Sequence, residues 1–201
     1  MKTSNGNRPP LFALASSSPR RIALLAATGL PFVVRPAEVD ESPRPGEGPE
    51  ATVLRLTALK AGQVTAQMPH LPVVSADTVV ALGDKIFGKP ASLGEAKATL
   101  MALSGKVHRV ITGYGVFWPA QGRERSGLAV TDIGFRRLIE PEIDWYLSLG
   151  QSLDKAGAYA LQSEGGFLTD RIEGSYTNAI GLPLKETLEA LSQVLGRAAL
   201  P

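Results

Sequence analysis

The pattern that decides the fold lies at residues 11–30, which read LFALASSSPRRIALLAATGL. A short apolar strand is expected at 11–15, and a helix follows the three serines from about Pro19 to Ala27. Apolar residues recur in this helix at spacings of three and four, and Gly29 comes directly after it as a stop signal. A second strand is expected at 31–34, so the chain begins with a strand–helix–strand unit.

Strands and helices continue to alternate beyond this unit. The loop at 35–49 is rich in proline, glycine and carboxylates. The GSYTN segment at 174–178 is expected to be a turn, with closure of a ligand cleft as the alternative. The patterns predict helices at 50–67, 92–103, 140–150 and 184–195, and strands at 71–80, 107–118, 126–138 and 166–172. Ser92 and Glu95 form a capping box at the start of the second of these helices, and Gly196 ends the last one. This order predicts an α/β protein with a long mixed sheet and a cleft.

Composition excludes several classes of protein. The 201 residues include no cysteine and only two widely spaced histidines, which excludes disulfides and thiolate zinc sites and argues against a histidine metal site. No run approaches the roughly 18 apolar residues of a membrane helix. The formal charge of +2 and the 6% aromatic content argue against nucleic-acid binding. We expect a cytoplasmic protein with a disordered tail at 1–10 and one domain, of one or two lobes, at 11–197.

The serine and arginine residues at the first helix have two interpretations. Pro19 suits the first helical position and Ser18 suits the N-cap, so the segment can simply start the helix. Alternatively, the helix N-terminus binds an anion together with the hydroxyls of Ser16 and Ser18 and an arginine fork. Arg20 and Arg21 point in different directions on a helix, so only one of them is expected to face a ligand.

Polar residues elsewhere are also candidates for a site. Lys60 falls on the apolar stripe of its helix, where it either reaches out to water or points into a polar cleft. The buried strand that begins at 71 is expected to end at 75–78, before two more valines, because aspartate is disfavoured within strands. Asp77 then either caps a turn after the strand or faces a cleft at the strand's carboxyl end, where it could act as a general base or hold a divalent cation. Lys89 is held between Gly88 and Pro90, so it either contacts a ligand or belongs to a surface turn. His108 is expected to be structural.

The segment 154–162, DKAGAYALQ, combines small residues with polar ones. Small residues allow a backbone to approach a ligand closely, and the amide of Gln162 offers the donor and acceptor needed to recognise a nucleobase edge. The chain has no GxxxxGK[ST] loop, no GxGxxG after a strand and no GxSxG elbow. These features favour binding of phosphorylated small molecules without a P-loop.

Six segments in this order resemble the Maf family of nucleoside triphosphate pyrophosphatases: LASSSPRR, SADTVV, GKP, SGKVHRVITG, DKAGAYALQ and GSYTNAIGLPL. The resemblance covers residues 11–195. It implies a fold related to the inosine triphosphate pyrophosphatases, with an elongated mixed sheet, flanking helices and a central cleft, often in a homodimer. It also implies hydrolysis of a nucleoside triphosphate to the monophosphate and pyrophosphate with a divalent metal, Mg²⁺ or Mn²⁺.

The resemblance implies roles for individual residues. Asp77 matches the proton acceptor of the family, and Glu41 matches an acidic residue that faces the metal, so that Glu41 and Asp77 would be its ligands. Lys60 and Lys89 match lysines that contact phosphate.

The resemblance also concerns substrate choice, which it associates with Arg20, Thr78 and Gln162. The ADT and DKAGAYxxQ motifs resemble the branch that acts on dTTP and UTP. Two alternatives stay open: an enzyme for 7-methyl-GTP or another modified nucleotide, and a non-catalytic nucleotide-binding regulator of cell division. Neither a nucleic acid nor a membrane is expected as a partner.

Overall fold

The structure is a computed structural model that describes residues 8–162 and 164–200. Most of the tail expected at 1–10, residues 1–7, lies outside the described residues. The described elements are β1 (Phe12–Leu14), α1 (Pro19–Ala26), β2 (Phe32–Val34), α2 (Pro49–Gln67), β3 (Val73–Leu82), β4 (Lys85–Phe87), α3 (Leu93–Leu103), β5 (Val107–Trp118), β6 (Arg123–Phe135), α4 (Glu140–Ser148), β7 (Thr169–Glu173), α5 (Tyr176–Ile180) and α6 (Leu184–Leu195), with short 3₁₀ turns at Pro119–Gln121, Ala156–Ala158 and Glu164–Leu168.

The predicted α/β class is confirmed. The seven strands form an open mixed sheet in the order β2-β1-β3-β5-β6-β7, and β4 pairs with β3 beside this path. Among the described residues, no helix has both the length and the apolar character needed to cross a membrane.

The chain forms two compact units. The first consists of the described parts of Met1–Asp77, Thr112–Ala129 and Gly181–Pro201, and the second of the described parts of Thr78–Ile111 and Val130–Ile180. Each unit has a hydrophobic core of its own.

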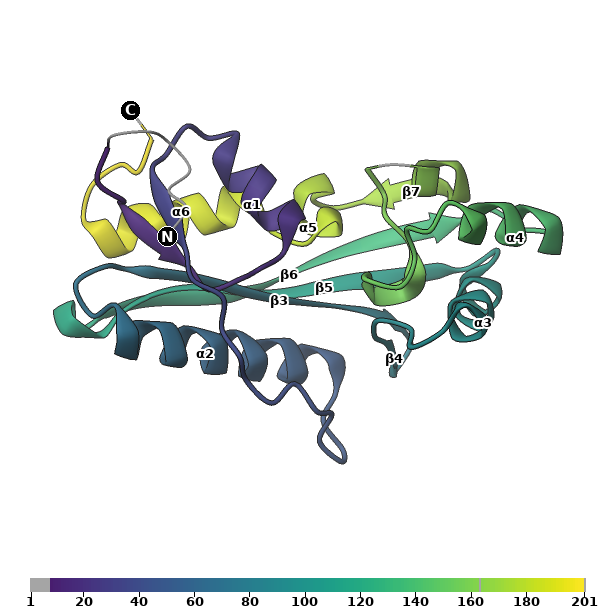
Figure 1. The fold of residues 1–201 in the computed structure, drawn as a ribbon, viewed down its shortest axis with the longest axis horizontal. Helices are drawn as coiled ribbons and strands as arrows, with labels where there is room; N and C mark the ends of the chain where they lie inside the picture. The colour runs from purple at the N-terminus through teal and green to yellow at the C-terminus, as the bar shows by residue number, and fades with distance from the viewer. Residues whose placement is uncertain (1–7, 163, 201) are drawn as a thin grey trace. The chain divides into compact units, whose positions relative to one another are not determined.

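In the first unit, alternation along the strands distributes apolar side chains to two faces. β1 pairs in parallel with both β2 and β3. Phe12 and Leu14 join a core with residues of α1 and α6, whereas Ala13 joins a core with residues of α2. Figure 1 shows α2 on one side of these strands and α1 and α6 on the other. The strand period of two therefore fixes which residues of β3 face α2.

The second unit packs α3 and α4 around its own core. Ser92 begins α3, as expected, because its hydroxyl accepts a hydrogen bond from the backbone N–H of Glu95 at 3.2 Å. The largest fully buried side chains of this unit are those of Tyr146, Leu100, Leu103, Ile111, Ile133, Ile143 and Leu168.

Two predictions about local structure are wrong. β3 continues through 75–78 to Leu82, because the valines after Asp77 extend the strand until it pairs with β4. Asp77 therefore lies within a strand and not at its end. The GSYTN segment is not only a turn, because α5 follows Ser175. The buried amide of Asn178 donates to the carbonyl of Val110 at 3.1 Å and to Thr131 Oγ1 at 2.9 Å, which holds this short helix in place.

His108 is structural, as predicted. Its side chain is buried, and its Nε2 lies 2.8 Å from the hydroxyl oxygen of Tyr159. Its ring packs edge-to-face against that of Phe135, with the ring centroids 4.8 Å apart. Burial lowers the pKa of His108 from 6.5 to about 4, because the apolar surroundings disfavour the imidazolium.

This burial predicts acid sensitivity of the fold. Between pH 6.5 and 4 the unfolded chain protonates His108 and the folded chain does not, so stability is complete above pH 6.5 and falls as the pH drops toward 4. The loss amounts to about 3 kcal/mol. Urea unfolding at pH 7.5 and pH 5 should show about 2 kcal/mol of this loss, since pH 5 lies above the folded pKa. His108→Gln should lose this share of the pH dependence, whereas His70→Gln, at the exposed second histidine, should keep it. Equal pH dependence in both variants would contradict the assignment.

Candidate functional site

The first unit places Asp77 opposite Lys60. Val73, Ser75 and Asp77 alternate along the side of β3 that faces α2, and the Ser75 hydroxyl donates to the carbonyl of Thr57 in α2 at 2.9 Å. Lys60 comes one turn after Thr57, on the same face of the helix. Its Nζ lies 2.5 Å from Asp77 Oδ1.

Lys60 binds a second carboxylate as well. Its Nζ lies 2.7 Å from Oε1 of Glu41, which belongs to the segment 35–48 between β2 and α2. The side chains of Lys60 and Asp77 are each 10% exposed, whereas that of Glu41 is 52% exposed. Of the two interpretations of Lys60, the structure shows the polar one: the ammonium does not reach out to water but bridges two carboxylates.

This bridge explains why an aspartate is tolerated within β3. Aspartate is depleted in strands, and a buried carboxylate costs free energy unless it is paired. The Lys60 ammonium supplies that pairing through short, charge-assisted hydrogen bonds. Two opposite charges that are both buried depend on one another, since removing either would leave the other unpaired.

The serine–arginine segment lies at the start of α1. Arg21 is buried: its Nε donates to the carbonyl of Gly181 at 2.8 Å, and an Nη donates to Ser16 Oγ at 3.3 Å. Ser16 Oγ also accepts from the backbone N–H of Ser18 at 3.2 Å. Ser18 occupies the N-cap position as expected, but its hydroxyl makes no capping hydrogen bond. Arg20 is only half-buried. Arg21 is therefore the arginine that holds structure.

Arg21 also responds to the carboxylates of the site. Burial lowers the pKa of its guanidinium, while attraction by Asp77 and, to a smaller extent, by Glu41 counteracts that shift. Asp77 thus lies in the field of two buried cations, Lys60 and Arg21. Such a field stabilises negative charge, whether on Asp77 or on a bound anion.

The other predicted residues, Thr78, Lys89 and Gln162, belong to the second unit. Thr78 is half-buried within β3, and Lys89 and Gln162 are exposed. A backbone hydrogen bond of 3.2 Å from Gly157 N–H to the Gly88 carbonyl joins the GKP segment to the DKAGAYALQ segment.

The small residue at 157 serves packing. Gly157 has a φ of +72°, and a Cβ there would lie 2.9 Å from a methyl carbon of Val80. The backbone at Gly157 therefore lies close to Val80 of β3, whereas the sequence had suggested that small residues in this segment let the backbone approach a ligand.

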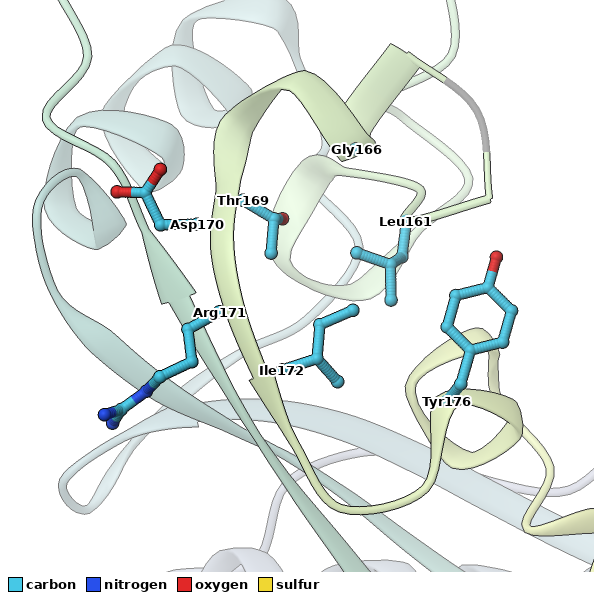
Figure 2. A pocket seen from close by; sticks show the side chains of 7 residues that line it. All are labelled: Leu161, Gly166, Thr169, Asp170, Arg171, Ile172 and Tyr176. Carbon is cyan, nitrogen blue, oxygen red and sulfur yellow. The ribbon is translucent and has the colours of Figure 1, made fainter.

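Sequence analysis missed a pocket of about 310 Å³ in the second unit (Figure 2). Figure 2 shows Leu161 and Ile172 pointing into it beside the ring of Tyr176, while the guanidinium of Arg171 points away. The lining residues are Leu161, Gly166, Thr169, Asp170, Arg171, Ile172 and Tyr176. Leu161 directly precedes Gln162, but the pocket depends on the fold of 161–176 and has no motif that would have revealed it.

The residues around Lys60 fit a divalent cation in part. Oxygens of Glu41 and Asp77 converge on one ammonium, that of Lys60. Carboxylate oxygens suit Mg²⁺ and Mn²⁺. Within the part of the chain that the structure describes, no group of three His, Cys, Asp or Glu residues could hold a metal. A metal at Glu41 and Asp77 would therefore need further ligands from water or substrate.

Comparison with known proteins gives one consistent picture. A family model described as "Maf-like protein" matches residues 11–194. A dTTP/UTP pyrophosphatase of Myxococcus xanthus is 47% identical, over 95% of this chain and 94% of its own length. Proteins with the same name from Anaeromyxobacter dehalogenans and Syntrophus aciditrophicus are 44% and 42% identical; the alignments cover 96% and 90% of this chain and 96% and 88% of those proteins. The similarity therefore extends over nearly the whole chain.

Proposed function

Since this chain belongs to the Maf family, we propose that it hydrolyses dTTP and UTP to the nucleoside monophosphate and pyrophosphate. The observation that carries the proposal is the buried Asp77, held 2.5 Å from Lys60 in the field of Arg21. A carboxylate in this position can accept a proton, and the cations around it can bind phosphate oxygens.

In the proposed reaction Asp77 takes a proton from a water molecule that attacks the α-phosphorus. The bond between that phosphorus and the bridging oxygen to the β-phosphorus breaks, and pyrophosphate leaves. The proton remains on the Asp77 carboxylate. A cation next to the site also stabilises the negative charge that develops on the phosphoryl oxygens.

Binding of the polyphosphate is assigned to several residues. Lys60, Lys89 and Arg20 would contact phosphate oxygens, together with the hydroxyls of Ser16 and Ser18 at the start of α1. Arg21 would not contact the phosphates directly, since its guanidinium donates to the Gly181 carbonyl and to Ser16 Oγ. Its positive charge would still favour a bound anion. Mg²⁺ or Mn²⁺, held by Glu41 and Asp77, would neutralise part of the polyphosphate charge and polarise the phosphoryl oxygen. The homodimer that the resemblance implies and the cytoplasmic location expected from the composition stay predictions.

A turnover screen tests the proposed activity. The purified chain is incubated with dTTP, UTP, CTP, GTP and 7-methyl-GTP in Mg²⁺ or Mn²⁺, and pyrophosphate and monophosphate are quantified. We expect equal amounts of both products, and most from dTTP and UTP. Release of orthophosphate, or preference for 7-methyl-GTP, would contradict the proposal. Binding of nucleotide without any pyrophosphate would instead identify a regulator.

Base preference is assigned to Gln162 and Thr78. Gln162→Ala should flatten the ranking of dTTP and UTP over CTP and GTP more than it lowers turnover, because the amide would contact the base and not the reacting phosphate. The measurement is kcat/KM for the four nucleotides. Gln193→Ala is the matched control: that amide, on α6, accepts from Arg125 at 3.0 Å, and its loss should leave the ranking unchanged. An unchanged ranking in Gln162→Ala would remove this residue from base selection.

A further inference from the structure

The arrangement around Lys60 has a consequence for how metal enters the site. We infer that in the nucleotide-free protein the Lys60 ammonium occupies the position of the divalent cation between Glu41 and Asp77, and that metal binds only together with a polyphosphate that draws Lys60 away. The inference concerns the same site and rests on the proposed function. In this inference the Lys60 ammonium keeps a metal ion from binding until substrate arrives.

The distances make the ammonium and the metal mutually exclusive. Lys60 Nζ lies 2.5 Å from Asp77 Oδ1 and 2.7 Å from Glu41 Oε1. Mg²⁺ bound by the same two oxygens would stand about 2.1 Å from each. The metal and the ammonium would therefore compete for the same two oxygens, and both are positively charged. Lys60 must therefore move before Glu41 and Asp77 can act together as ligands.

The charge balance gives the same result. Glu41 and Asp77 carry two negative charges, and Lys60 and Arg21, which interacts with both carboxylates, carry two positive ones. Arg20 adds a further positive charge close to Arg21. A divalent cation would add two uncompensated positive charges to a largely buried site, at a high electrostatic cost. A triphosphate supplies the missing negative charge and oxygen ligands. The described residues offer no third carboxylate or histidine that could complete a metal site.

Lys60 is also able to move. Glu41 belongs to the segment 35–48, and its side chain is 52% exposed, so its contact with Lys60 can open without burying or exposing much surface. The flexible four-carbon stem of lysine lets the ammonium exchange a carboxylate for a phosphate oxygen. The same movement would uncover Asp77 as a base only when substrate is present.

Binding of Mn²⁺ in the absence of nucleotide tests the inference, with free Mn²⁺ measured by electron paramagnetic resonance. Lys60→Met removes the ammonium and should bind one Mn²⁺ at least about tenfold more tightly than the unmodified chain. Lys60→Arg keeps a cation there and should bind Mn²⁺ as weakly as the unmodified chain. Mn²⁺ should also raise the melting temperature of Lys60→Met more than that of the unmodified chain.

Specific outcomes would overturn the inference. One is that Lys60→Met binds Mn²⁺ no more tightly than the unmodified chain. Another is that the tight binding survives when Asp77→Asn is added to Lys60→Met, since the ion would then lie elsewhere. Should Lys60→Met not fold, Lys60→Gln, which keeps a neutral donor beside the carboxylates, carries the same expectation. These measurements involve no turnover, so they are independent of whether pyrophosphate is released.

Discussion

Replacing Asp77 with asparagine should lower the turnover of dTTP and UTP by about a hundredfold or more, while the chain stays folded. An amide cannot accept the proton of the attacking water, so the general base is lost. The amide oxygen can still accept a hydrogen bond from Lys60, which keeps its second partner, Glu41, at 2.7 Å. The measurement is kcat from pyrophosphate release, accompanied by the midpoint of thermal unfolding.

A matched aspartate provides the control. Asp144 in α4 also binds a lysine, Lys97, at 2.7 Å, but its side chain is 53% exposed. Asp144→Asn removes the same charge from an exposed ion pair, and such pairs contribute little to stability. Since Asp144 has no assigned part in the reaction, this variant should also leave kcat unchanged. Near-normal turnover of Asp77→Asn would count against Asp77 as the base and against the proposed mechanism.

The sequence predicts most of the strands and helices because their signals are local. Short apolar runs predicted β1 and β2, and the glycines after α1 and α6 predicted where these helices end. Ser92 and Glu95 predicted the start of α3, and the apolar run at 107–118 coincides with β5.

The site could be predicted only in part, because its geometry depends on contacts between distant residues. Whether Lys60 points to water or to Asp77 is decided by the register of α2 against β3, which no local pattern shows. The continuation of β3 past Asp77 depends on its pairing with β4. The helix at α5 depends on the buried contacts of Asn178. The resemblance to a family implied roles for Asp77 and Lys60, but it did not predict that they bind each other.

The close packing of α2 against β5 leads to the second prediction, a large loss of stability. At Gly113 in β5 a Cβ would lie 2.6 Å from the carbonyl oxygen of Val53 and 2.9 Å from Thr57 Oγ1. The nearest atom belongs to the helix backbone, which cannot rotate away as a side chain can. Gly113→Ala should therefore push α2 outward, weaken the 2.9 Å hydrogen bond from Thr57 to the Gly113 carbonyl, and destabilise the fold by about 2–4 kcal/mol. Urea unfolding measures this loss.

Gly62→Ala, in the same helix, is the control for Gly113→Ala. A Cβ at Gly62 meets nothing within 4 Å, and alanine favours the helix by about 0.5–1 kcal/mol, so this variant should be more stable. Since Lys60 lies one turn after Thr57, an outward shift of α2 in Gly113→Ala should also lengthen the contact of Lys60 with Asp77 and lower turnover. Unchanged stability and turnover in Gly113→Ala would mean that α2 can move freely on β5. In that case the position of Lys60 would not be set by the packing of this helix.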